Sequence, residues 1–237
     1  MPALIQLLLT HPPQLRTYPA RLHGAACALL ENPDTDHTAA IKPFATTPLT
    51  PHPDGTATWQ LGWLPDTPPP VIPATITFGD TTCTVLDQHL THHTYLQLAT
   101  TPTPLRAVEF TITSPMYFSR NGRDHPLPDP VLITRNLITR WNHHAPAHIH
   151  ITDTHTRDVT THIHLIHLDG HTVRAKTTYT SHQTGYLGTV TLGLPRTAPP
   201  HTHHTLATLA HYATITGIGA QTTHGYGTCQ LTATTPA

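Results

Sequence analysis

The chain of 237 residues suits two domains of about 100 to 120 residues. It carries no apolar run long enough to span a bilayer and no signal-peptide pattern, so we expect a cytoplasmic protein. Its three cysteines are widely spaced, which favours neither a disulfide framework nor a zinc cage. The formal net charge of -1 with histidine neutral is low for a nucleic-acid-binding protein, although roughly a quarter of the 23 histidines carry charge at pH 7.

The first half of the chain reads as a strand, a helix and a set of strands. Leu4 to Leu9 is a short apolar run typical of a buried strand, and Pro19 to Glu31 has an apolar stripe at helical spacing. Further strands are predicted at 41–49 and 56–64, on either side of a Pro-Asp-Gly turn, and at 74–78 and 82–86. The proline-rich stretch 65–73 excludes a helix, and a short helix near Thr94 leads to a linker at 100–104.

The second half begins with a predicted strand at 107–114 and a loop carrying Arg120, Asn121, Gly122 and Arg123. A helix starts at Pro128-Asp129-Pro130 and ends near Trp141. Beyond this helix, histidine alternates with isoleucine or leucine over 147–152 and 160–168, which predicts two strands, and further strands are predicted at 171–179 and 186–194. A last helix at 203–214 runs into a glycine-rich loop and a closing strand at 228–231.

This order of elements predicts an α+β fold of two sandwiches, residues 1–104 and 105–237, each with helices on one face of an antiparallel sheet. The loop GIGAQTTHGYG, residues 217–227, follows a helix and precedes a strand. A dinucleotide fold needs the opposite order, so we reject a nucleotide cofactor and expect no cofactor. The bare backbone at Gly217, Gly219, Gly225 and Gly227 could instead let amide groups approach a phosphate, with a tight turn at a helix end as the structural alternative.

Several segments resemble the Cas6 family of CRISPR repeat endoribonucleases, a repeat-associated RNA-binding superfamily. The C-terminal segment YATITGIGAQTTHGYGTCQL is similar to the glycine-rich signature of that family. The other matching segments occur in family order and are IKPFATTPL, ITSPMYF, LPDPVLITRNLITRWN and TGYLGTVTLGL. The resemblance implies two ferredoxin-like (RNA-recognition-motif-like) domains and RNA cleavage.

Metal-free cleavage of RNA needs a base for the 2'-hydroxyl, an acid for the leaving 5'-oxygen and a cation beside the phosphorane. The family pattern selects His23, His37 and Lys42. His37, five positions before Lys42, is the nearest match to the catalytic histidine of the family, and His23 falls where relatives carry tyrosine or histidine. Lys42 stands out because Lys176 is the other lysine in the chain, and its structural alternative is a surface charge at a strand edge.

The remaining cations are candidates for gripping a repeat hairpin, although each could equally be a solvated surface charge. They are Arg120, Arg123, Arg135, Arg140, Arg174 and Lys176, of which the last two share one strand face. Two pairs of histidines would also share a strand face and could bind a transition metal: His148 with His150, and His162 with His164. A histidine-rich solvent face explains them more simply, so we predict no metal site.

We therefore predict a metal-independent endoribonuclease that cuts CRISPR precursor RNA within repeats and leaves a 2',3'-cyclic phosphate. The candidate partners are repeat RNA, subunits of a CRISPR interference complex and a second copy of the chain. One alternative is a catalytically silent relative that only binds guide RNA in an effector complex, and another is a histidine-rich metal-binding protein.

Overall fold

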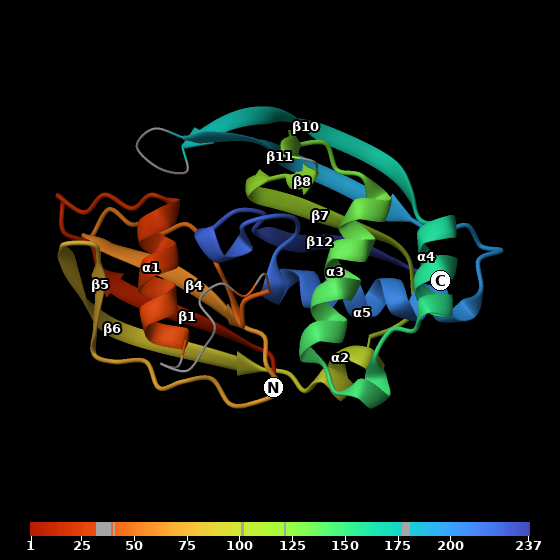
Figure 1. The fold of residues 1–237 in the computed structure, drawn as a ribbon, viewed down its shortest axis with the longest axis horizontal. Helices are drawn as coiled ribbons and strands as arrows, with labels where there is room; N and C mark the ends of the chain where they lie inside the picture. Colours follow the sequence, from red (N-terminus) through yellow and green to blue (C-terminus); the bar gives the residue numbers. More distant parts are fainter. Residues whose placement is uncertain (32–38, 40, 101, 121, 177–180) are drawn as a thin grey trace.

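The computed structural model describes residues 1–31, 39, 41–100, 102–120, 122–176 and 181–237, in which the chain forms one antiparallel sheet in each half, with helices packed against both sheets (Figure 1). A third, two-stranded sheet joins β8 and β9. The predicted α+β class with antiparallel sheets is thus confirmed. Within the described ranges, no helix has the length and apolar character needed to cross a membrane.

The N-terminal sheet has the strand order β2-β4-β1-β6-β5, with β3 paired to β4. Its central strand β1 buries every second residue, including Ile5, Leu7 and Leu9, and pairs with β4 and β6 on its two sides. The strands are β1 (Ala3–Thr10), β2 (Phe44–Thr46), β3 (Thr50–Pro51), β4 (Thr56–Trp63), β5 (Thr75–Phe78) and β6 (Thr81–His92). Helix α1 (Pro19–Leu30) lies across one face and buries Leu22 and Leu30 against the sheet (Figure 1).

Two predicted strands of this half have different bounds in the structure. The strand expected at 41–49 is replaced by the short β2 and β3, because Pro48 has no amide hydrogen for the ladder between them. Strand β6 extends well beyond the predicted 82–86, since it follows β1 to its end. Leu86 and Leu90 in this extension are exposed, because β5 pairs only with the first residues of β6.

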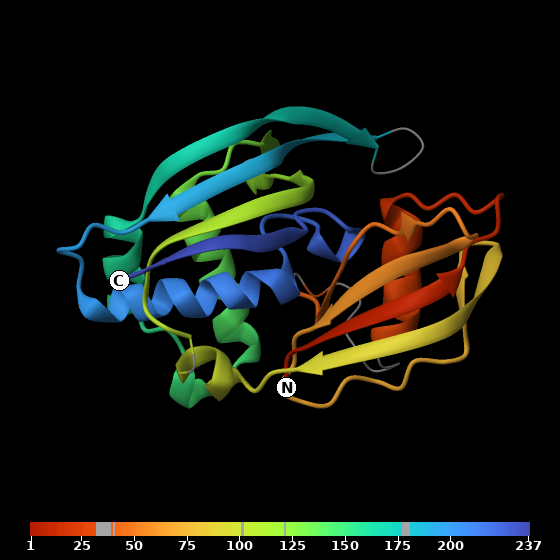
Figure 2. The ribbon, with the colours of Figure 1, turned by 180° about the vertical axis from the view of Figure 1, so that it is seen from behind.

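The C-terminal sheet has the strand order β10-β11-β7-β12. Figure 2 shows the long β10–β11 hairpin reaching past the helices toward the N-terminal half, and helix α5 running beside β12. The strands are β7 (Leu105–Met116), β8 (Phe118–Arg120), β9 (Arg123–His125), β10 (His164–Lys176), β11 (His182–Gly193) and β12 (Cys229–Pro236). The helices are α2 (Tyr95–Thr100), α3 (Pro130–His144), α4 (Asp153–His162) and α5 (Pro200–Thr216), with 3-10 turns η1 (Ala147–Ile149) and η2 (Thr222–His224).

Helix α5 is buried along most of its length and links the two halves. Its C-terminal end packs on β4 at Gly62, where an added Cβ would collide with the backbone carbonyl of Ile215. Tyr95 of α2 is buried in the core of the C-terminal half, and its hydroxyl donates to the Leu64 carbonyl at 2.7 Å. The division of the chain at residue 104 stays a prediction, and α2 lies on the N-terminal side of it while packing with the C-terminal core.

The strand predicted at 147–152 was wrong, and the strand predicted at 160–168 was right only in part. Residues 147–149 form η1, and α4 ends at His162 before β10 begins at His164. Thr152 caps α4 by accepting a hydrogen bond from the His155 amide, so a helix lies between the two expected strands and takes in the start of the second. In the loop predicted to carry them, Arg120 and Arg123 pair with each other at the ends of β8 and β9.

Candidate active site

A cavity of about 270 Å³ lies where α1, the segment leading into β2 and the loop at residues 217–227, hereafter the glycine loop, come together. Its lining combines residues that are up to 201 positions apart in the sequence, from His23 to His224. The side chains that matter for chemistry are His23, Lys42, Arg140, Thr223 and His224. The structure therefore brings together His23 and Lys42, two of the three predicted catalytic residues.

His23 projects into this cavity from α1, on the flank of the apolar stripe that holds the helix on the sheet. Its Nδ1 lies 3.2 Å from the carbonyl oxygen of Thr223. Because a carbonyl can only accept, Nδ1 carries the proton and the neutral ring has its lone pair on Nε2. Burial is the main cause that lowers the pKa of His23 below its ordinary value, so the ring is neutral at pH 7.

His224 lies parallel to His23, with ring centroids 3.9 Å apart and planes inclined by 8°. Its Nδ1 is 3.1 Å from the hydroxyl oxygen of Thr223. Burial first, and the neighbouring His23 second, lower the pKa of His224 to about 4. Two imidazolium charges at this separation would repel each other strongly, so the pair is stable with both rings neutral.

Lys42 is part of a buried ion pair and not a surface charge at a strand edge. Its Nζ lies 2.8 Å from Oε1 of Glu31, and the two side chains are 10% and 1% exposed. Cys27 is hydrogen-bonded to Glu31, and its Sγ lies 3.5 Å from Nε2 of His23. Burial, with the charge of Glu31, raises the pKa of the Cys27 thiol to about 11, so this cysteine stays protonated.

Arg140 was predicted to bind RNA, but its guanidinium fastens the glycine loop to α3. It donates to the carbonyl of Thr216 at 2.8 Å, to the hydroxyl of Thr222 at 2.7 Å and to the carbonyl of Gly219 at 2.7 Å. Burial lowers its pKa to about 10, which leaves it charged at neutral pH. These hydrogen bonds engage Nη1 and Nη2, which gives Arg140 a structural role in holding the glycine loop, and its predicted contact with RNA stays a prediction.

The glycines of the loop shape its turns, because all four have positive φ angles and are buried. Their amide groups already donate within the protein, to Ala213 (from Gly217), Asn136 (from Gly219), Thr222 (from Gly225) and Pro115 (from Gly227). The expectation that these amides bind a phosphate is therefore replaced. The glycines fold the loop so that Thr223 and His224 reach His23.

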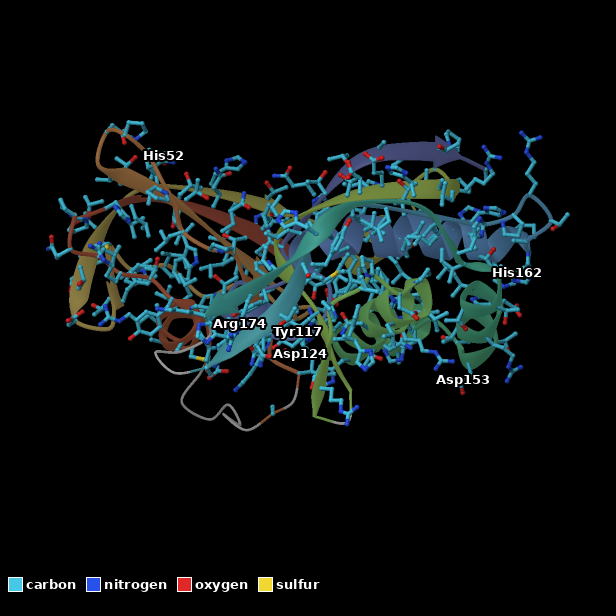
Figure 3. The ribbon with its side chains drawn as sticks, turned by 90° about the horizontal axis from the view of Figure 1, so that it is seen from above. His52, Tyr117, Asp124, Asp153, His162 and Arg174 are labelled. Atoms are coloured by element: carbon cyan, nitrogen blue, oxygen red, sulfur yellow. The ribbon has the colours of Figure 1, made fainter. Side chains whose placement is uncertain are left out.

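Four of the predicted RNA-binding cations are exposed: Arg123, Arg135, Arg174 and Lys176. The side chain of Arg120 lies outside the described part of the structure. Arg174 and Lys176 lie near the distal end of β10, where Figure 3 shows Arg174 in the neighbourhood of Tyr117 and Asp124. The Tyr226 hydroxyl donates to the Lys176 carbonyl at 3.1 Å, which joins this end of the hairpin to the glycine loop.

His37 falls in the stretch 32–38, outside the described residues. Four residues of the cavity region were not predicted from the sequence: Cys27, Glu31, Thr223 and His224. The signal that could have found the last two is their position inside the glycine-rich signature.

Neither of the histidine pairs that suggested a metal site shares a strand. His148 lies in η1 and His150 follows it, whereas His162 ends α4, which Figure 3 shows away from Arg174, and His164 begins β10. Among the described residues, no three His, Cys, Asp or Glu side chains form a group that could hold a metal ion.

Comparisons with known proteins agree with this arrangement. The family profile of the CRISPR-associated endoribonuclease Cas6 matches residues 110–229, half of the chain, whereas a comparison with curated proteins finds no match. Two solved Cas6 product complexes are each 23% identical with a TM-score of 0.80; the first covers 98% of this chain and 99% of its own, and the second 97% and 99%. Thermus thermophilus Cas6 is 22% identical with a TM-score of 0.70 and covers 97% of both chains.

These structural matches confirm the predicted pair of ferredoxin-like halves as the fold. The profile match includes the core of the C-terminal half and the whole glycine loop, which supplies one wall of the cavity. The chain belongs to the CRISPR-associated endoribonuclease Cas6 family.

Proposed function

We propose that this protein cuts CRISPR precursor RNA within its repeats, without a metal ion, to give mature guide RNA. The observation that carries the proposal is the cavity that combines a neutral histidine, His23, with the buried ammonium group of Lys42. Membership of the family supports RNA cleavage, and similar structures are described as Cas6 product complexes and as a Cas6 complex with a substrate mimic.

In the proposed reaction, the 2'-oxygen of one nucleotide attacks the adjacent phosphorus, and the bond from phosphorus to the 5'-oxygen of the next nucleotide breaks. The products are a 2',3'-cyclic phosphate and a 5'-hydroxyl. Neutral His23 suits the general base, which takes the proton of the 2'-hydroxyl on Nε2. We assign the general acid to His37, on the family resemblance alone.

Lys42 would stabilise the negative charge that develops on the phosphorane oxygens. A compact ammonium group held by Glu31 acts as a fixed point charge, and because its side chain is only 10% exposed, its charge is screened less than it would be in bulk solvent. General acid-base help contributes roughly a hundred- to ten-thousandfold to such a rate.

The proposed RNA-binding surface consists of the exposed cations Arg123, Arg135, Arg174 and Lys176, together with Arg120. Arg135 borders a second hollow of about 640 Å³ between α3 and β8, next to Ala220 of the glycine loop. A repeat hairpin that contacts these groups would reach the cavity across the glycine loop. Subunits of a CRISPR interference complex and a second copy of the chain remain proposed partners.

The test is incubation of the protein with end-labelled repeat RNA from its own CRISPR array in excess EDTA, followed by sizing and end-group analysis. We expect one cut per repeat, a 2',3'-cyclic phosphate and a 5'-hydroxyl. Tight binding without cleavage would instead favour the silent guide-binding relative, and cleavage that EDTA abolishes would overturn the metal-free mechanism.

Two variants test the assigned residues. His23→Ala and His37→Ala should each slow cleavage about a hundredfold or more while RNA affinity stays within about twofold. His148→Ala, which removes an exposed histidine of η1, is the matched control and should cleave as the unmodified protein does. Unchanged cleavage by either active-site variant would remove that residue from the mechanism.

A further inference from the structure

The parallel packing of His224 on His23 is not used by the proposed mechanism. His224 reaches His23 from the glycine loop, across 201 positions of sequence, and the two rings overlap face to face at 3.9 Å. In a chain with 23 histidines a chance contact is common, but this contact is built from several independent restraints.

Those restraints hold His23 on three sides. The Thr223 carbonyl fixes Nδ1, the ring of His224 covers one face, and Phe44 lies at the tilted angle of 33° with its centroid 6.0 Å away. The sulfur of Cys27 approaches Nε2 at 3.5 Å from the same helix. An imidazole with its ring plane and one nitrogen fixed keeps a single orientation and a single tautomer.

The support for His224 is itself anchored. Thr222, two positions before His224, accepts a hydrogen bond from Arg140 at 2.7 Å, and the Gly225 amide donates to the Thr222 carbonyl. Gly225 is packed so closely on the backbone of Thr47 and Pro48 that a Cβ there would lie 3.3 Å from it. The chain is therefore anchored on both sides of His224, at Thr222 and at Gly225, and His224 can act as a fixed wall for His23.

The protonation state of His23 depends on the charged and titratable groups around it, of which His224 is one. The groups that face His23 from the packed elements are Cys27 of α1, Glu31 at the C-cap of α1, Lys42 before β2, Arg140 of α3 and His224 itself. Glu31 favours the charged form of His23, whereas Lys42 and burial disfavour it. His224 is neutral at the working pH, so it contributes exclusion of water and no positive charge.

We propose that His224 is a positioning residue for RNA cleavage, which holds the imidazole of His23 in one orientation by stacking and closes the cavity around it. The inference rests on the proposed function, because it assigns a role toward the proposed base. His224 does not itself transfer a proton in this scheme. Its ring, and not its ionisation, is what the reaction needs.

The experiment compares His224→Ala with His224→Phe in single-turnover cleavage of repeat RNA, at several values between about pH 5 and about pH 9. Loss of the ring in His224→Ala should slow cleavage roughly tenfold or more at neutral pH, because a small misplacement of a reacting group costs this much. It also admits water to His23, so the pKa of His23 rises and the acid limb of the pH-rate profile moves to higher pH. His224→Phe keeps the stacked ring and should restore most of the rate and the original acid limb.

Circular dichroism, thermal unfolding and RNA affinity of both variants check folding, and His148→Ala serves again as the control. If His224→Ala cleaves as the unmodified protein does across the pH range, the proposal is overturned. If His224→Phe is as slow as His224→Ala although it is folded and binds RNA, the imidazole itself is required and the positioning role is overturned. If the unmodified protein binds but does not cut, the proposed function fails first, which distinguishes the two failures.

Discussion

Replacing Glu31 by glutamine should destabilise the protein substantially, because it leaves the charge of Lys42 in a nearly closed site without the matching carboxylate charge. The ion pair is 2.8 Å long and its carboxylate is 1% exposed. At an effective dielectric constant of about 20, the attraction at that distance is roughly 6 kcal/mol, against several kcal/mol for desolvating each ion. Removal of one partner of such a pair typically costs about 3 to 5 kcal/mol. Taking about 3 kcal/mol, the melting temperature should fall by about 6 to 12 °C for a chain of this size.

Thermal unfolding followed by circular dichroism measures this change, and Asp80→Asn is the matched control. Asp80 pairs with Arg21 at 3.1 Å, but its side chain is 79% exposed, so its loss should cost under about 1 kcal/mol. A double variant, Glu31→Gln with Lys42→Met, removes both charges and should recover part of the stability lost in Glu31→Gln. The reasoning is refuted if Glu31→Gln melts within about 2 °C of the unmodified protein, as the control should.

Three further predictions use other parts of the structure. Gly227→Ala should strongly destabilise the fold, because it places a Cβ against the backbone of Ile218 at a positive φ angle. Gly24→Ala should instead stabilise the fold by up to about 1 kcal/mol, because Gly24 lies in α1 with open space around it. Chemical denaturation of the two variants measures both changes in the free energy of unfolding. Arg140→Lys should lower the melting temperature, because an ammonium group cannot reproduce the hydrogen bonds that the guanidinium group makes to the glycine loop. Arg123→Ala should leave the melting temperature unchanged, but it should reduce RNA affinity and the dependence of that affinity on salt. Burial lowers the pKa of His144 to about 4, so the stability that its neutral form contributes is present above about pH 6.5 and is lost as the pH falls toward 4. The melting temperature of the unmodified protein should therefore decrease over that range, and it should decrease less for His144→Gln.

Much of the fold could be predicted from the sequence, because most of its elements have clear local sequence patterns. The alternating burial of β1, the apolar stripe of α1 and the Asp129 cap of α3 are all local signals, and the structure has these elements close to their predicted bounds. Helix α4 could not be predicted in the same way. It buries Val159 alone, so it has no periodic apolar stripe, and it is stabilised by its Thr152 cap and by packing between α3 and α5.

The candidate site was predicted only on the side that the family pattern describes. His23 and Lys42 were named because they match family positions, and the structure places both in one cavity. Glu31 could not be named, because a charge pair depends on tertiary contacts that one sequence does not reveal. His224 could have been noticed inside the glycine-rich signature, but its stacking on His23 could not have been predicted. The structural role of Arg140 was also not predicted, because a guanidinium that holds a loop and one that lies free on the surface look the same in a sequence.

The contact between His23 and residues 223–224 has a consequence for when the protein becomes active during its synthesis. The ribosome makes the N-terminal half first, and α1 with its sheet has its own apolar core that can form early. The wall that Thr223 and His224 provide is made later than α1, because Thr223 lies 200 positions beyond His23 in the sequence. While only the N-terminal half has been made, His23 and Lys42 therefore lack this wall, and the proposed cleavage of RNA should require the glycine loop to dock on α1 first.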